Sequence, residues 1–221
     1  MAIYFIVALI SYLLGSIPFG YILLRVFRGE DVRQHGSGNI GATNVARKAP
    51  GLGIATLVLD ALKGSAAVVI ARLIAQSHFN YHREAYVPVY DHDLYALMAV
   101  AAMFAILGHV FPIWLKFKGG KGVATGVGTF LAIAPKAVLV VLVIFAVFVA
   151  AFRYISLGSI VATAAFPVFA WLLYRNQSSP AVFAATVAAA ALIIIKHHQN
   201  IRRLLAGTEH RFELKHRTEH S

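Results

Sequence analysis

LYALMAVAAMFAILGHVFPIWL, residues 94–115, contains no acidic or basic side chain apart from one histidine. A helix of about 20 such residues is long enough to cross the hydrocarbon core of a bilayer. Residues 51–76 form a second predominantly apolar run of this length, and residues 2–24 form another near the amino terminus. The sequence therefore predicts a protein built from transmembrane helices.

The composition of the whole chain supports this prediction. Of the 221 residues, 59% are hydrophobic and only 13% are charged, whereas a soluble domain carries about 25% charged residues. Such a chain has too little polar surface for a soluble single-core protein and too much apolar surface to remain disordered in water. We predict an all-α polytopic membrane protein.

The distribution of basic residues predicts how the chain is oriented. No positive charge precedes residues 2–24, whereas three arginines follow this run closely. A secretory signal has the reverse order, so we expect a retained helix with its amino end outside. The basic segments 25–48 and 116–121 then share one face of the membrane, and the positive-inside rule makes that face cytoplasmic.

The apolar stretch 123–195 is divided into four pieces. Its interruptions are Pro135 with Lys136, Arg153 and residues 174–180. Because the first piece, residues 123–134, is only about two-thirds of a full span, we expect a re-entrant or tilted half-helix there. We predict about seven membrane segments, with the amino terminus outside and the carboxyl terminus cytoplasmic. They form a single domain over residues 1–213, followed by a solvated tail at 214–221.

The net charge indicates which partners to expect. Twenty Lys and Arg against nine Asp and Glu give +11 with His neutral, and cysteine is absent. On so apolar a chain the basic excess must lie in the few segments that reach water, where it favours lipid head groups and phosphorylated substrates. Nucleic acid is disfavoured because the charge is dispersed among short loops. Without cysteine, disulfides, thiolate metal sites and cysteine nucleophiles are excluded.

The first polar segment on the basic face is GSGNIGATNVAR, residues 36–47. Its glycines permit backbone angles that turn successive N–H groups toward one anion, and Arg47 adds a planar fork suited to phosphate. The candidate substrate-binding donors in this segment are Ser37, Gly38, Asn39, Thr43 and Asn44. An ordinary turn that caps the next helix would look the same, so this segment alone leaves both interpretations open.

The second polar segment, GHVFPIWLKFKGGKGVAT, covers residues 108–125. A glycine-rich loop that leads into a helix presents unpaired N–H groups to phosphate, and two lysines supply charge. The candidate substrate-binding residues here are Lys118, Gly119, Gly120, Lys121 and Gly122. The spacing is not that of a Walker motif, which disfavours ATP hydrolysis. The alternative is a pair of interfacial lysines that meet lipid head groups, and His109 is expected to be a bonded interior residue.

The third polar segment, KHHQNIRRLLAGTEHR, covers residues 196–211. If the preceding helix continues, His197 and Asn200 lie on its inward side, whereas the two arginines that follow point toward head groups or toward Glu209. The alternative is a basic amphipathic helix on the membrane surface. Two adjacent histidines without carboxylates do not make a zinc site. We expect neither a metal nor a cofactor.

One charged pair lies at membrane depth. Asp60 and Lys63 are three residues apart near the middle of the run 51–76 and can neutralise each other on one helix face. Charges at this depth face the bundle interior or water. We interpret the pair as structural support.

The three segments together resemble those of the bacterial acyl-phosphate:glycerol-3-phosphate acyltransferases, integral membrane enzymes of phospholipid synthesis. The resemblance runs in order from the first helix to about residue 212 and rests on residues 37–44 with Arg47, on residues 108–122, and on His197, Asn200, Arg202 and Glu209. It implies a seven-helix protein of the bacterial inner membrane whose active site faces the cytoplasm. It also implies that Glu209 supports structure, that the catalytic residues are Ser37, Arg47, His197 and Asn200, and that a lysine of the second segment belongs to the active site.

The activity implied by the resemblance is transfer of a fatty acyl group from acyl phosphate to the first hydroxyl of glycerol 3-phosphate, giving 1-acyl-glycerol 3-phosphate and phosphate. Because an acyl phosphate is already activated, we expect direct transfer without an acyl-enzyme. His197 is either a base or a hydrogen-bond donor, and we expect a monomer.

Two rival functions follow from the same residues. A transporter of phosphorylated metabolites would place its site near the bilayer midplane between repeated halves. A noncatalytic lipid-binding scaffold would tolerate Lys→Arg changes at positions 118 and 121.

Overall fold

The computed structural model describes residues 1–78, 92–175 and 179–212, which contain helices and connecting loops but no strand. In chain order the helices are α1 (Ala2–Ser16), α2 (Phe19–Arg28), η1 (Val32–Gln34), α3 (Ala42–Lys48), α4 (Pro50–His78), α5 (His92–Val110), η2 (Ile113–Leu115), α6 (Val123–Leu131), α7 (Pro135–Phe152), α8 (Ile155–Tyr174), α9 (Pro180–Lys196) and α10 (His198–Leu205). The all-α prediction is confirmed. The predicted tail at 214–221 lies outside the described residues.

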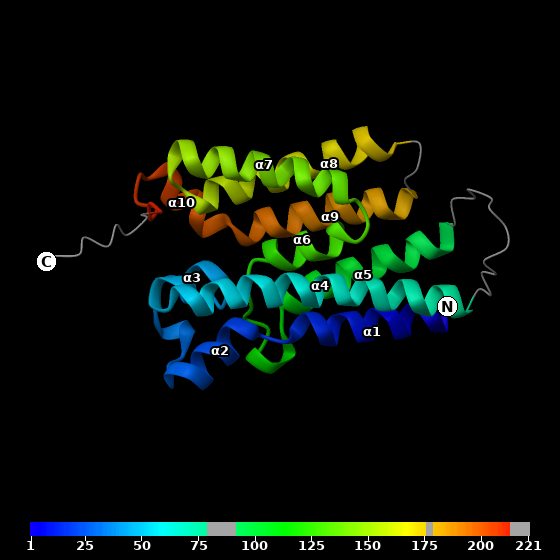
Figure 1. Cartoon of the computed structure of the whole chain (residues 1–221), viewed down its shortest axis with the longest axis horizontal. Coiled ribbons are helices and arrows are strands. Elements are labelled where there is room, and N and C mark those ends of the chain that lie inside the picture. Colours follow the sequence, from blue (N-terminus) through cyan, green and yellow to red (C-terminus); the bar gives the residue numbers. More distant parts are fainter. Residues whose placement is uncertain (79–91, 176–178, 213–221) are drawn as a thin grey trace, which may run out of the picture.

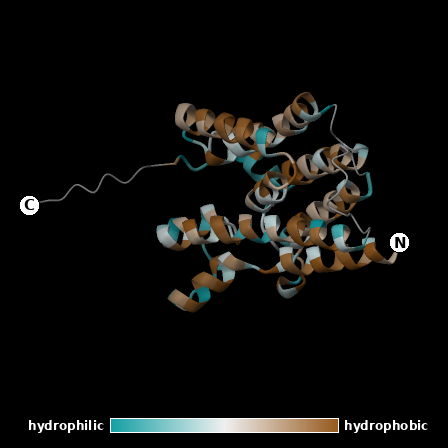
Figure 2. Cartoon of the chain, turned by 45° about the vertical axis from the view of Figure 1, so that its right-hand side comes forward, coloured by the Kyte–Doolittle hydropathy of each residue, from teal (hydrophilic) through white to brown (hydrophobic). Residues whose placement is uncertain are grey.

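Within the described ranges, five stretches are long and apolar enough to cross a membrane. They are Ala2–Arg28, Pro50–His78, His92–Leu115, Pro135–Phe152 and Ile155–Tyr174. Helices α9 and α10 pass the same test only as a pair, and the chain bends by 56° between them. Figure 2 shows that apolar residues dominate these helices. The chain is therefore a multi-pass membrane protein.

The fourth predicted segment, the short piece at residues 123–134, contains α6, which has nine residues. At 1.5 Å per residue it is about 14 Å long, about half the thickness of the hydrocarbon core. This length agrees with the half-helix expected there. The number of crossings and the sides on which the termini lie stay predictions.

Close backbone contacts hold the bundle together. A Cβ atom on Gly15 of α1 would overlap the carbonyl oxygen of Ala105 on α5, and one on Gly128 of α6 would overlap that of Ala61 on α4. Glycine is needed at both positions because the helices approach through their backbones, as is common in membranes. The second contact fixes α6, and with it the loop that precedes α6, against α4.

A buried charged group links α4 to its neighbours. Lys63 Nζ lies 2.7 Å from Asp60 Oδ1 and donates a hydrogen bond of 2.7 Å to the carbonyl oxygen of Ile17, at the break between α1 and α2. His109 Nδ1 of α5 lies 3.6 Å from Asp60 Oδ1. All three side chains are buried, as expected for the interior position of His109, but His109 Nδ1 makes no hydrogen bond with any described residue. Each charge has a partner, which is what burial in a membrane requires.

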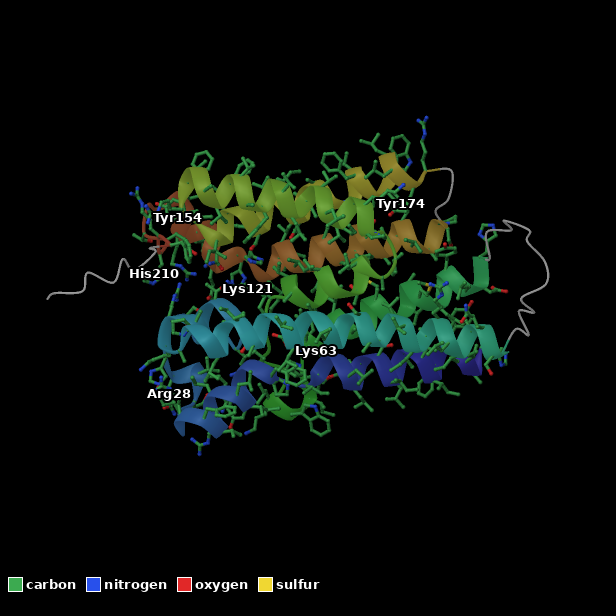
Figure 3. The ribbon with its side chains drawn as sticks, in the orientation of Figure 1. Arg28, Lys63, Lys121, Tyr154, Tyr174 and His210 are labelled. Atoms are coloured by element: carbon green, nitrogen blue, oxygen red, sulfur yellow. The ribbon has the colours of Figure 1, made fainter. Side chains whose placement is uncertain are left out.

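The polar ends of the helices gather at one end of the bundle. In Figure 1, α2, α3 and α10 lie at the end opposite the amino terminus. Figure 3 places Tyr154 and His210 at the same end as α10, with Lys121 deeper along the bundle and Tyr174 at the far end. The three polar segments therefore lie in one half of the molecule. This arrangement positions the candidate site.

Candidate active site

The first polar segment is organised by the side chain of Asn44. Its Nδ2 donates to the carbonyl oxygens of Asn39, His35 and Val32 at 2.8, 3.0 and 3.1 Å, and its Oδ1 accepts from the N–H of Ser37 at 3.1 Å. Because Asn44 is buried and its amide is fully engaged, it holds the loop in shape. A direct contact between Asn44 and substrate stays a prediction that these bonds do not support.

Ser37 on this loop and Arg47 on α3 are both exposed. Gly36 adopts a φ of +54°, and a Cβ atom there would overlap Asn44 Oδ1 and lie 3.2 Å from Arg47 Nη1. The glycine thus lets the guanidinium of Arg47 lie against the loop at Gly36. Gly38 and Thr43 are also exposed, whereas Asn39 is partly buried and caps the turn by accepting from the N–H of Gly41 at 2.8 Å.

The glycines of the second segment seat Lys121 against α5. The N–H groups of Gly119 and Gly120 donate to the carbonyl oxygens of Val110 and His109 at 3.2 and 3.0 Å. A Cβ atom on Gly120 would overlap His109 Nε2. These two N–H groups are therefore hydrogen-bonded within the protein, contrary to the expectation of unpaired donors. Gly119 and Gly120 thus support the shape of the loop.

The other members of this segment differ in their surroundings. Gly122 is buried, has a φ of +92° and is the N-cap of α6. Lys118 is exposed and makes no side-chain hydrogen bond or ion pair among the described residues. Lys121 is partly buried and points into the bundle. Of the two lysines predicted to bind substrate, Lys121 is therefore the one that is partly buried, whereas Lys118 is exposed.

Lys121 is bonded to the third segment through a chain of short contacts. Its Nζ donates to Asn200 Oδ1 at 2.6 Å, and Asn200 Nδ2 donates to Glu209 Oε1 at 2.6 Å. The same carboxylate accepts from Arg203 Nε at 2.6 Å and from Ser156 Oγ at 2.7 Å. The amide of Asn200 is thereby oriented, with its oxygen toward the lysine. Residues distant in sequence thus form one connected unit.

Charge also connects Lys121 with the first segment. Lys121 belongs to the loop before α6, outside the candidate spans, and burial lowers its pKa to about 8. The carboxylate of Glu209 opposes this shift, whereas the positive charges of Arg203 and Arg47 add to it. Arg47 is therefore within electrostatic reach of Lys121. We call Arg47, Lys121, His197, Asn200 and Glu209 the polar cluster.

His197 lies at the junction of α9 and α10 and is buried. Its Nδ1 is 2.7 Å from the carbonyl oxygen of Ile193. A carbonyl oxygen can only accept, so Nδ1 carries a proton, and in the neutral ring Nε2 then keeps a lone pair. The predicted inward orientation of His197 and Asn200 is confirmed by their burial, and the ring is poised to accept a hydrogen bond.

Sequence reasoning missed Ser156 and left Arg203 with two alternatives. Ser156 is the second residue of α8, where a serine is usual and carries no functional signal. Arg203 pairs with Glu209, one of the two partners considered for it. Burial opposes ionisation of Glu209, but hydrogen bonds from Arg203, Ser156 and Asn200 outweigh it and hold the pKa of Glu209 below its usual value.

Replacing Glu209 by Ala is expected to lower stability. The carboxylate is 5% exposed and accepts from three side chains, and each buried donor left without a partner costs about 1–3 kcal/mol. Thermal unfolding in detergent should show a lower midpoint and a smaller folded yield, with exposed His210→Ala as the control. A stable but inactive Glu209→Ala protein would contradict the supporting role.

The fold and the polar cluster define a multi-pass membrane protein with a cationic, donor-rich site near one end of its bundle. A family model described as "Glycerol-3-phosphate acyltransferase" matches residues 5–207. The chain belongs to the glycerol-3-phosphate acyltransferase family.

Individual relatives match over nearly their whole length. A protein named "Glycerol-3-phosphate acyltransferase" from Syntrophotalea carbinolica is 45% identical over 96% of this chain and 100% of its own. One with the same name from Geobacter sulfurreducens is 44% identical over 94% of this chain and 97% of its own.

Two solved structures are also similar. A crystal structure of PlsY, described as an integral membrane glycerol 3-phosphate acyltransferase in its glycerol 3-phosphate form, matches with a TM-score of 0.77 and 36% identity, and covers 95% of this chain and 96% of its own. The lysophosphatidic acid form of PlsY matches with a TM-score of 0.74 and 35% identity, and covers 95% of both chains. The integral membrane fold of the chain agrees with theirs.

Proposed function

We propose that the protein transfers a fatty acyl group from acyl phosphate to the first hydroxyl of glycerol 3-phosphate, giving 1-acyl-glycerol 3-phosphate and phosphate. The observation that carries this proposal is the meeting of Arg47, Lys121 and Asn200, which come from three separate segments, in one polar cluster. The acceptor and the product of this reaction differ by one acyl group. They are the two ligands named for PlsY, whose fold this chain shares.

The cluster suits phosphate-bearing substrates. Arg47 offers a planar fork for phosphate, and Lys121 offers a positive charge beside the neutral amide of Asn200. Both substrates carry phosphate, so the cations hold them side by side with the acceptor hydroxyl close to the donor carbonyl. Ser37, Gly38, Asn39, Thr43, Lys118 and Gly122 are proposed as further contacts.

The chemistry requires no acyl-enzyme. The acceptor hydroxyl oxygen attacks the donor carbonyl carbon, a C–O ester bond forms, and the bond from that carbon to the phosphate oxygen breaks. Donors of the cluster stabilise the developing oxyanion, and the hydroxyl proton leaves either to His197 Nε2 or to the departing phosphate. An acyl group trapped on Ser37 or His197 during turnover would contradict this mechanism.

The setting of the reaction completes the proposal. We place the polar cluster at the cytoplasmic face of a bacterial inner membrane, on the strength of the basic segments 25–48 and 116–121. The protein acts there as a monomer amid membrane lipids and without nucleic acid. A transporter is disfavoured because Lys121 of the cluster lies toward one end of the bundle rather than at its middle (Figure 3).

An assay of purified protein in detergent tests the activity and its donor. Phosphate and 1-acyl-glycerol 3-phosphate should appear in equal amounts only when acyl phosphate and glycerol 3-phosphate are both present. A transporter would show nothing here, because detergent leaves no sealed compartment. Acyl-CoA with glycerol 3-phosphate serves as the parallel reaction. Product formed with acyl-CoA but not with acyl phosphate would contradict the proposed donor.

The pH dependence of the reaction should report Lys121. As pH rises through about 8, Lys121 of the free protein loses its proton and its charge, so kcat/KM for glycerol 3-phosphate should fall up to about tenfold per pH unit above that value. Arginine stays charged throughout this range. In an active Lys121→Arg variant the alkaline decline should therefore vanish, and an unchanged decline would assign it to another group.

A further inference from the structure

A groove lies between the α1–α2 break, η1 and η2. Its volume is about 690 Å³, and it is lined by Ile17, Pro18, Tyr21, Ile22, Arg33, Trp114, Leu115 and Lys116. None of these residues belongs to the polar cluster. The proposed reaction therefore leaves this groove without a role.

The groove combines apolar walls with cations. Two of its lining residues are basic and none is acidic. Arg33 is paired with Asp31 at 2.6 Å and lies 4.9 Å from the ring centroid of Tyr21. Lys116 is exposed and makes no side-chain hydrogen bond or ion pair with any described residue. The positive charge of Lys116 thus lies at the rim of the mainly apolar groove. This combination complements an amphiphile with an anionic head group.

The backbone that holds Lys116 at this rim is conformationally strained. Lys116 and Phe117 have φ values of +52° and +61°, and they are non-glycine residues in the left-handed region. Hydrogen bonds from Phe117 N to Pro112 O at 3.0 Å and from Lys118 N to Leu115 O at 3.1 Å close the turn. Strained residues of this kind are typical of positions that clamp a ligand.

The groove reaches the boundary between hydrocarbon and head groups at one end only; its other end, at Ile17, lies beside Lys63 at membrane depth. Trp114 and Lys116 stand at the end of the candidate span His92–Leu115, where apolar sequence gives way to lysines. Trp114 is 62% exposed, and tryptophan is enriched at the level of the head groups. Lipid is the amphiphile present there at the highest concentration.

We propose that the groove binds one anionic glycerophospholipid of the surrounding bilayer. Its phosphate lies against Lys116, with Arg33 as the second cation, and an acyl chain runs along Ile17, Ile22 and Trp114. Zwitterionic lipids bind less well because their head groups carry no net charge to match the rim.

The two tryptophans of the chain, Trp114 and Trp171, allow a direct test. In a Trp171→Phe protein, Trp114 is the sole tryptophan and reports on the groove. The protein is placed in phosphatidylcholine vesicles that contain increasing fractions of phosphatidylglycerol with brominated acyl chains, which quench tryptophan on contact. Quenching should reach half its maximum at a several-fold lower fraction than with brominated phosphatidylcholine.

Matched variants locate the charge that gives this preference. Lys116→Gln should abolish it. Arg28→Gln should retain it, because Arg28 is an exposed cation of the neighbouring α2 that does not line the groove. Equal quenching by both lipids, or a preference unchanged in Lys116→Gln, would overturn the proposal. Relief of quenching by a small amount of acyl phosphate would instead assign the groove to the donor.

Discussion

Replacing Lys121 by Met is expected to lower kcat/KM for acyl transfer at least about a hundredfold, the loss typical for one preorganised donor at a site of developing charge. Lys121 donates to Asn200 at 2.6 Å and lies within electrostatic reach of Arg47. Methionine keeps much of the length of the side chain but removes its charge and its donors. The rate is measured from phosphate release at saturating acyl phosphate.

Two variants control this experiment. Lys118→Met removes an exposed lysine that makes no side-chain bond among the described residues, and it should cost much less. Lys121→Arg keeps the charge but changes the shape of the donor, so it should be impaired, whereas a lipid-binding scaffold would tolerate it. Equal losses in Lys121→Met and Lys118→Met would contradict the central position of Lys121.

Replacing Gly120 by Ala is expected to cost about a hundredfold in activity, with most of the protein still inserted in the membrane. The added methyl would overlap His109 Nε2, and His109 is buried beside Asp60. The loop must therefore shift and carry Lys121 away from Asn200, and a displacement of about 1 Å at a reacting centre is enough for such a loss. Activity per folded protein is measured after size exclusion in detergent.

The cause of the Gly120→Ala effect can be tested by compensation. Combining it with His109→Ala removes the ring that the methyl would meet, so part of the activity should return relative to Gly120→Ala alone. Gly51→Ala is the matched control, because a Cβ at Gly51 meets no atom within 4 Å. A double variant no better than Gly120→Ala would place the damage elsewhere.

The helices and the polar half of the molecule could be predicted because both depend on local composition. The interruption at Arg153, for example, marks the C-cap of α7, and the short piece at 123–134 contains α6. The lengths of the hydrophobic runs and the charged residues between them indicate these features without knowledge of any distant contact.

The partners of individual polar groups could not be predicted in the same way. The sequence is the same whether the side chain of Asn44 and the N–H of Gly120 bond to a ligand or to the protein. In the structure both bond to the protein. Ser156 and Glu209 are 53 positions apart, and Lys121 and Asn200 are 79 apart. Such pairings depend on helix packing, which a single sequence does not state.

The placement of Asp60 and Lys63 on one helix bears on how the chain enters the bilayer during synthesis. A lone ion at the centre of an inserting segment costs about 3 kcal/mol, but these two ions are 2.7 Å apart within α4 itself. The nascent segment can thus leave the translocon for lipid already neutral, before α5 has been made. Biogenesis need not wait for His109, whose part begins only when the later helices assemble.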